Sequence, residues 1–263
     1  MPRLEARGVE IAWSEHGRGS PVLLIHETAA TQAVWKPLAE ALARELRAIA
    51  YDRRGWGASS EPDDYRRTTI EEQSEDAAAV LEATADEPAI VCGAGVGAVI
   101  ALDLMLRCDD LVSAAVLIEP MLLQLTPTAT TALSEDRRRI EIAAGNRENV
   151  IDVYLSGALS ALGPGVTRMP DQAAEAARAR PRSVLAELGI PAAWRMPLPR
   201  LASAVRPSAI VICESTPRLL GDAAQSLGPR LAQSAIREVS SREDPPHVGG
   251  PAEVASIVAE LSP

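Results

Sequence analysis

Short runs of consecutive apolar residues alternate along the chain with longer segments in which apolar positions recur every three or four residues. The short runs are typical of buried β-strands, and the longer spacing is typical of helices with one buried face. Thr69, followed three residues later by Glu72, marks the beginning of one such helix. This alternation predicts a mostly parallel sheet with helices on both faces. Strands are predicted at 4–7, 9–14, 21–26, 47–52, 89–93 and 112–119, and helices at 32–46, 69–83 and 97–107.

The alternation stops between residues 120 and 207, where the chain is rich in Ala and Arg and no strand is evident. Proline and glycine divide this stretch into helix-length runs. We therefore predict an α/β core made of residues 1–119 and 208–263, with residues 120–207 inserted as a helical cap. Helices are predicted within the cap at 134–144, 147–161, 172–180 and 182–188; after it, strands are predicted at 209–213 and 236–240 and helices at 219–233 and 252–261.

Residues 89–102 combine a buried strand, a glycine-rich turn and an apolar helix. Gly93 and Gly97 fit the outer positions of the pattern Gly-x-Ser-x-Gly, in which a strained bend presents a nucleophilic serine at the top of a sheet. The middle position is Gly95. Glycine relieves the backbone strain of such a bend but has no side chain that could attack a substrate. The pattern therefore predicts the shape of a nucleophile turn without its nucleophile.

Four motifs, in this order, resemble those of the α/β-hydrolase fold superfamily over essentially the full length of the chain. They are the apolar strand and histidine at 24–27, the turn at 51–59, the glycine turn around Gly95, and the final loop and helix at 246–254. The resemblance implies an α/β-hydrolase fold: a mostly parallel eight-stranded sheet, helices on both faces and a helical cap inserted after the sixth strand. Fold alone does not imply chemistry.

The resemblance assigns the histidines only in part. In the family, the final loop often carries two histidines, of which the first is the catalytic base. Aligning Pro251 and Val254 with the family pattern places His247 on the second histidine and Asp244 at the position of the base. A shifted loop would instead bring His247 into the site, and both alternatives stay open. His26 matches a largely structural histidine beside the loop that stabilises an oxyanion.

Several carboxylates are predicted at strand ends, where the family places its third catalytic residue. Glu119 ends the sixth core strand and Glu214 the seventh, and each could face the pocket or cap the end of its strand. Glu27 stands where the family often has glycine, and it could bring a base to the pocket or point to solvent. Apolar burial raises the pKa of a carboxyl group, so one of these acids could exchange protons near neutral pH.

Two main-chain groups are the candidate oxyanion donors. One is the N–H of Val96, at the beginning of the helix after the turn, and the other belongs to the loop at Glu27 and Thr28. Neither depends on the side chain at position 95, and the helix dipole strengthens the first. Trp35 is one of the few aromatic residues, and it either lines the pocket mouth or packs in the core.

Three functions remain open at this point. The first is an enzyme without a Ser-His-Asp triad that performs non-hydrolytic acid/base chemistry, such as cyclisation, isomerisation, elimination or addition, on a small apolar substrate such as a natural product. The second is a catalytically inactive pseudo-hydrolase that binds a ligand or a partner, and the third is a residual or engineered-inactive ester hydrolase. The candidate catalytic residues are Glu27, Glu119, Glu214, Asp244 and His247, and the candidate binding residues are His26, Thr28, Trp35, Gly95 and Val96.

Charge and composition limit the classes of molecule that the protein is expected to bind. A net charge of −10 argues against nucleic acid and against anionic membranes. Three cysteines, an odd number, favour free thiols and a cytoplasmic location, and neither a signal peptide nor a membrane span is expected. No phosphate loop, metal-ligand cluster or dinucleotide fingerprint appears, so we expect no cofactor and no metal. The expected partner is a small-molecule substrate or ligand, and a homodimer stays open.

Overall fold

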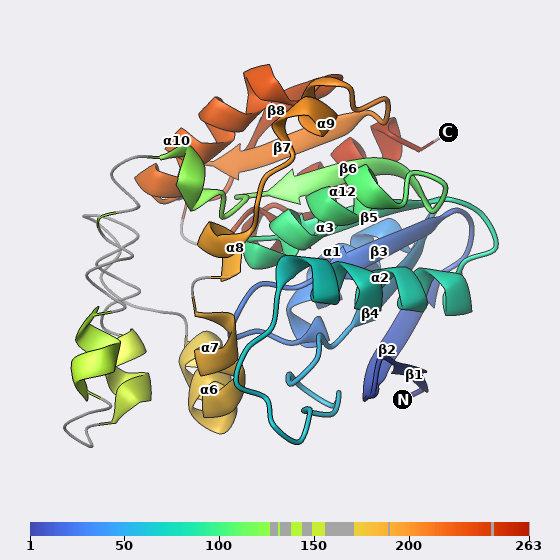
Figure 1. The fold of residues 1–263 in the computed structure, drawn as a ribbon. Helices are drawn as coiled ribbons and strands as arrows, with labels where there is room; N and C mark the ends of the chain where they lie inside the picture. Colours follow the sequence, from blue (N-terminus) through green and yellow to red (C-terminus); the bar gives the residue numbers. More distant parts are fainter. Residues whose placement is uncertain are drawn as a thin grey trace.

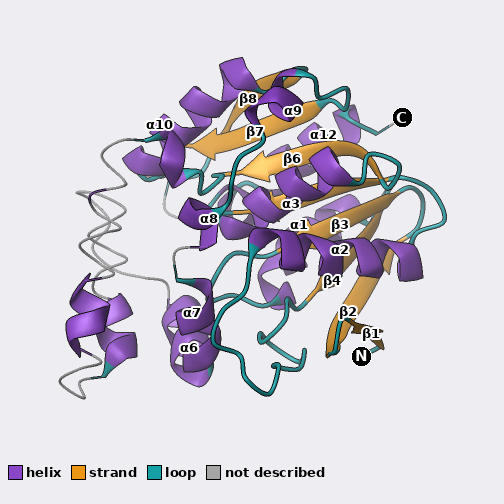
Figure 2. Ribbon diagram, in the orientation of Figure 1, coloured by secondary structure: helices purple, strands orange, loops and turns teal. Residues whose placement is uncertain are grey.

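The computed structural model describes residues 1–126, 131, 138–143, 149–155, 171–188, 190–242 and 245–262. Its centre is an eight-stranded twisted sheet with helices on both faces (Figures 1 and 2). The strand order is β1-β2-β4-β3-β5-β6-β7-β8. Strand β2 runs antiparallel to β1 and β4, and the other neighbouring strands are parallel, as predicted. The strands are β1 (Arg3–Ala6), β2 (Val9–Gly17), β3 (Pro21–Ile25), β4 (Arg47–Tyr51), β5 (Ala89–Ala94), β6 (Val112–Ile118), β7 (Ser208–Cys213) and β8 (Ser234–Val239).

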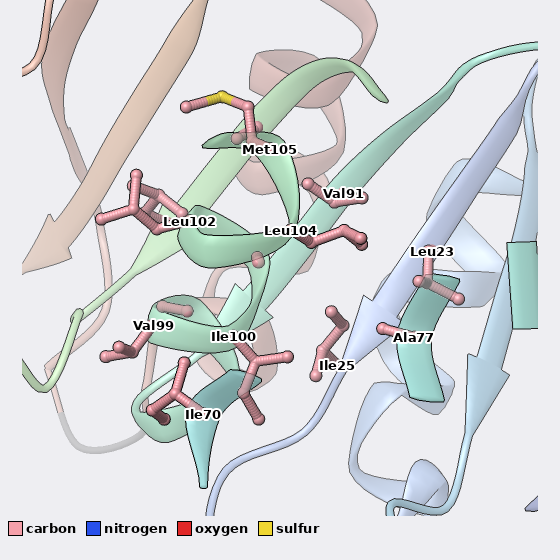
Figure 3. Packing of buried hydrophobic residues seen from close by; sticks show 14 of the residues in the cluster. Leu23, Ile25, Ile70, Ala77, Val91, Val99, Ile100, Leu102, Leu104 and Met105 are labelled. Carbon is pink, nitrogen blue, oxygen red and sulfur yellow. The ribbon is translucent and has the colours of Figure 1, made fainter. Parts of the chain in front are cut away.

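Each face of the sheet carries its own hydrophobic core. Successive side chains of a strand point to opposite faces, so Leu23 and Ile25 of β3 enter one core while Val22 and Leu24 enter the other. Burial on both faces explains why this strand reads as a continuous apolar run. Figure 3 shows the first core, in which α3 packs against β3 and β5. The first core lies under α2 (Ile70–Thr84), α3 (Val96–Arg107) and α10 (Arg218–Leu227), and the second under α1 (Lys36–Leu42) and α12 (Pro251–Glu260).

Helix boundaries follow local chemistry. Thr69 caps α2 as predicted, because its hydroxyl accepts a hydrogen bond of 3.0 Å from the N–H of Glu72. The helix predicted at 32–46 is divided into a 3₁₀ turn (Gln32–Trp35) and α1. Proline lies in the first turn of α1, and it fits there because it has no N–H to donate to a preceding turn.

The described residues between β6 and β7 form helices but no strand. The predicted helices at 172–180 and 182–188 are confirmed, whereas those at 134–144 and 147–161 lie partly outside the described residues. Helices α6, α7 and α8 lie at the side of the sheet toward which the arrows of β6 and β7 point (Figure 1). The described helices of this stretch are α6 (Asp171–Ala179), α7 (Pro181–Glu187), α8 (Ile190–Ala193) and α9 (Leu198–Ala202).

None of the helices in these ranges is long and apolar enough to cross a membrane.

Candidate active site

A sharp turn at Gly95 joins β5 to α3. Its φ of 55° and ψ of −115° lie in a region that residues with a Cβ rarely adopt. A Cβ at Gly97 would lie 2.1 Å from the carbonyl oxygen of Ile25, so glycine lets α3 approach β3 closely. Position 95 is different, because a Cβ there would meet only the Cβ of Glu27, at 3.1 Å. The space above the turn is therefore bounded by the Glu27 side chain.

Main-chain donors flank this space. Val96 is the first residue of α3, and the first N–H groups of a helix have no acceptor within it. Within the ranges that the structure describes, the N–H groups of Val96 and Thr28 meet no backbone acceptor. Helix α3 presents the positive end of its dipole here. Both groups therefore remain candidate donors to a developing negative charge on oxygen.

The side chains of Glu27 and His247 face each other but do not form a hydrogen bond. The Nε2 of His247 lies 3.9 Å from the Oε2 of Glu27, beyond hydrogen-bond distance, and the His247 side chain is only 1% exposed. Among the residues that the structure describes, that carboxylate oxygen and both ring nitrogens have no hydrogen-bond partner. The His247 ring packs on Trp35, with ring centroids 4.5 Å apart. Buried polar atoms without partners are costly, so this pair is suited to a group that arrives from outside.

The protonation of His247 follows from its burial. Desolvation lowers the pKa of the imidazole, and the nearby Glu27 carboxylate only partly opposes this effect. The ring is therefore neutral at neutral pH, with one nitrogen able to accept a proton and the other able to donate one.

Glu119 follows β6 directly and lies beside the same turn. The N–H of Gly95 donates a 3.0 Å hydrogen bond to the carbonyl of Ile118, which holds the end of β6 against the turn. Burial raises the pKa of Glu119 to about 7; a 2.7 Å hydrogen bond from the Thr216 hydroxyl opposes the rise and the charge of Glu27 adds to it. Glu119 therefore exchanges a proton near neutral pH, and its carboxyl group senses the charge of Glu27.

The structure thus brings three of the five predicted catalytic residues together: Glu27, Glu119 and His247. Glu214 is not among them, because its side chain is 56% exposed and pairs with Arg242 at 3.2 Å. Asp244 lies outside the described residues. The alignment that placed a base at Asp244 therefore stays a prediction.

His26 holds the loop that carries Glu27. Its Nε2 accepts a hydrogen bond of 3.0 Å from the backbone N–H of Arg53, and its Nδ1 donates one of 2.7 Å to the carbonyl of Glu27. The ring is fully buried, and desolvation, reinforced by the charge of Arg53, lowers its pKa well below the ordinary value. His26 is thus neutral, and both of its ring nitrogens are hydrogen-bonded within the protein; its role in binding stays a prediction.

Sequence reasoning missed Glu187, at the end of α7. It is the only acid in the predicted helix 182–188, and that single acid is a weak signal. Its carboxylate is buried and accepts hydrogen bonds from the side chains of Thr28 (2.7 Å), Arg53 (2.6 Å) and Trp56 (2.8 Å). These donors are distant in sequence, so only the folded chain shows that they converge.

Metal binding finds no support in the part of the chain that the structure describes, where no three His, Cys, Asp or Glu side chains gather in a way that could hold an ion.

The sequence matches a known family model and several curated proteins. The family model described as "Alpha/beta hydrolase family" matches residues 16–256. Over 122 residues the chain is 34% identical to the uncharacterized hydrolase YraK of Bacillus subtilis (strain 168), which is 46% of this chain and 45% of that protein. Over 110 residues it is 33% identical to the putative carbamate hydrolase RutD of Azorhizobium caulinodans. The aligned residues make up 42% of this chain and 41% of that protein. The matches thus span less than half the length of these curated relatives.

Solved structures agree with the fold over a longer range. An α/β hydrolase from Sphaerobacter thermophilus DSM 20745 is 25% identical, with a TM-score of 0.68 over 99% of both chains. A thermophilic esterase from Thermogutta terrifontis has a TM-score of 0.76 over 99% of this chain and 97% of the esterase. At 19% identity, the second likeness shows the fold alone.

Proposed function

Because the chain belongs to the α/β hydrolase family, we propose that it is an enzyme in which carboxyl and imidazole groups transfer protons on a small apolar substrate. The reaction class is non-hydrolytic: cyclisation, isomerisation, elimination or addition through an enolate or alkoxide. One observation carries the proposal. Glu27 and His247 face each other at 3.9 Å with unpartnered polar atoms, beside a turn whose central residue, Gly95, has no side chain.

The roles follow from the protonation states. Above pH 7 Glu119 is a carboxylate, and it removes a proton from the carbon next to a substrate carbonyl. The oxygen that becomes negative binds the N–H of Val96, where the α3 dipole stabilises it. Glu119, which then carries this proton, returns it to another carbon of the substrate, and the carbonyl re-forms; this sequence is an isomerisation. The neutral His247 lies beside Glu27, and its unpartnered ring nitrogens are available to hydrogen-bond the substrate. Gly95 adds no side chain between the turn and Glu27.

Deuterium exchange tests this proposal without knowledge of the natural substrate. Small cyclic ketones, namely cyclopentanone, cyclohexanone and 2-tetralone, are incubated with the protein in D₂O, and loss of their α-hydrogens is followed by proton NMR. We expect exchange above the buffer rate, reduced on the order of 10²-fold or more in Glu119→Gln or Glu27→Gln. Glu214→Gln is the matched control and should retain the rate, because that side chain is exposed and paired with Arg242.

Two results would overturn the proposal. One is wild-type exchange no faster than that of the double variant Glu27→Gln/Glu119→Gln for all three ketones. The other is an equal loss of exchange in Glu214→Gln. Either result would favour the pseudo-hydrolase alternative, in which the same unpartnered groups only bind a ligand.

Hydrolysis by direct attack of water is the second candidate, and His247 favours it. An unpartnered neutral imidazole near a free main-chain donor can activate water toward an ester held by the N–H of Val96. The names of the relatives, a putative carbamate hydrolase and an esterase, are consistent with this chemistry. Turnover of p-nitrophenyl acetate without a burst, lost in His247→Gln and retained in Glu119→Gln, would support hydrolysis over proton transfer.

A further inference from the structure

Glu187 links the inserted helix α7 to the loop that carries Glu27. Its Oε2 accepts the hydroxyl of Thr28 at 2.7 Å and a guanidinium N–H of Arg53 at 3.1 Å. Its Oε1 accepts a second guanidinium N–H at 2.6 Å and the indole N–H of Trp56 at 2.8 Å. Both members of the ion pair are 1% exposed. These donors saturate a carboxylate that would otherwise be a costly buried charge.

Two routes of hydrogen bonds run from this carboxylate to the backbone around Glu27. The first is the side chain of the next residue, Thr28, which Glu187 holds directly. The second passes through Arg53, whose Nε donates 2.8 Å to the carbonyl of His26 and whose backbone N–H donates to the ring of His26. That ring donates in turn to the carbonyl of Glu27 at 2.7 Å. The backbone of Glu27 is thus fixed from both directions.

We propose that Glu187 is a positioning residue, which holds the Glu27 carboxylate beside Gly95 and His247. The geometry of the site then depends on the position of α7, which carries Glu187. This inference rests on the proposed function for its catalytic meaning, but its structural content can be tested separately. Glu187 itself does not touch the reacting atoms. It acts through Thr28, Arg53 and His26.

The observations distinguish this role from simple stabilisation of the fold. An ion pair that only stabilises the fold needs no partner beyond Arg53. The Glu187 carboxylate also accepts a hydrogen bond from the hydroxyl of Thr28, the residue directly after Glu27. In addition, the charge of Glu27 raises the pKa of Glu119, so displacement of Glu27 changes the titration of Glu119. Removal of the Thr28 hydroxyl should therefore affect Glu119 even though the two residues share no hydrogen bond.

The experiment uses Thr28→Val, which deletes the hydroxyl but keeps the main-chain N–H and the Arg53–Glu187 ion pair. The carboxyl carbons of glutamate are labelled with ¹³C, Glu119 is assigned by comparison with Glu119→Gln, and its titration is followed by NMR. Thr28→Ser serves as the conservative rescue. Thr84→Val is the matched control, because it removes a hydroxyl that donates only to a helix carbonyl at the end of α2.

We expect the titration midpoint of Glu119 to fall by about 0.5 pH unit in Thr28→Val, because Glu27 moves away and its charge raises that midpoint less. Thr28→Ser and Thr84→Val should keep the wild-type midpoint. The rate of deuterium exchange into the ketone should fall by about tenfold in Thr28→Val at unchanged KM, because only the alignment of Glu27 changes.

A Glu119 midpoint that is the same in folded Thr28→Val and in wild type would overturn the positioning role. Failure of the proposed function gives a different result: the midpoint shifts as expected, but none of the proteins exchanges ketone hydrogens. The two failures are therefore distinguishable.

Discussion

Replacing Glu119 by Gln should make the protein more stable at alkaline pH. Burial raises the pKa of the Glu119 carboxyl from its ordinary value of 4.5 to about 7. Between these two values the folded protein keeps a proton that the unfolded chain releases, so a rise in pH favours unfolding. Wild-type stability should therefore fall as pH rises from 4.5 to 7 and then level off. Glutamine carries no charge, and it keeps an oxygen that can accept the hydroxyl of Thr216.

The magnitude follows from the same two values. Each pKa unit corresponds to about 1.4 kcal/mol, so the difference between 4.5 and about 7 corresponds to about 3 kcal/mol once Glu119 is fully ionised. This figure is the most that Glu119→Gln can gain in the free energy of unfolding at pH 8. At pH 4.5 the two proteins should differ little, because the carboxyl group is then largely protonated in the folded state.

Urea denaturation at pH 4.5, 6, 7 and 8 measures this effect as the difference in unfolding free energy between wild type and variant. Each pair must give equal m-values, so that the difference reports stability alone. Glu214→Gln, which removes an exposed acid, should not reproduce the pH dependence. A difference between wild type and Glu119→Gln that is constant over this range, or a less stable variant at pH 8, would refute the assignment of a buried titrating acid beside the turn.

Three further substitutions test other parts of the account. Gly95→Ser should give no burst of p-nitrophenyl acetate hydrolysis, because Asp244 aligns with the position of the base; strong activity would show instead that the histidine of the final loop is the base. Gly97→Ala should lower the unfolding free energy by more than about 2 kcal/mol, because its Cβ would lie 2.1 Å from a main-chain oxygen of β3, while Gly221→Ala, with its nearest neighbour 3.9 Å away, should not. Glu187→Ala should cost about 3–5 kcal/mol in the same denaturation assay, because it leaves a buried guanidinium unpaired, and a cost below about 1 kcal/mol would contradict the burial of that pair.

The fold could be predicted because its determinants are local. A strand buried on both faces is expected to be apolar throughout, and β3 is. Gly93 and Gly97 also stand out in the sequence because no other residue allows the close approach of α3 to β5 and β3. The change at Lys36, where a 3₁₀ turn gives way to α1, is subtler, since it depends on one proline in a continuous amphipathic pattern.

The site could be predicted only in part. Glu27 and Glu119 follow strands whose carboxyl ends meet at one edge of a parallel sheet, so the sequence places them together. The same reasoning placed Glu214 there. However, the direction of a side chain beyond a strand end depends on the conformation of the turn, and the Glu214 side chain is exposed and pairs with Arg242. Glu187 could not be found in this way, because its partners come from other segments of the chain.

The pH dependence of ketone exchange tests the central claim most directly. Deuterium exchange into 2-tetralone is measured from pH 5 to 9 with wild type, Glu119→Gln and Glu214→Gln. The account predicts that the wild-type rate rises through an apparent pKa near 7, that Glu214→Gln follows the same curve, and that Glu119→Gln loses both the rate and the transition. A wild-type curve that persists unchanged in Glu119→Gln would contradict proton transfer by this carboxyl group.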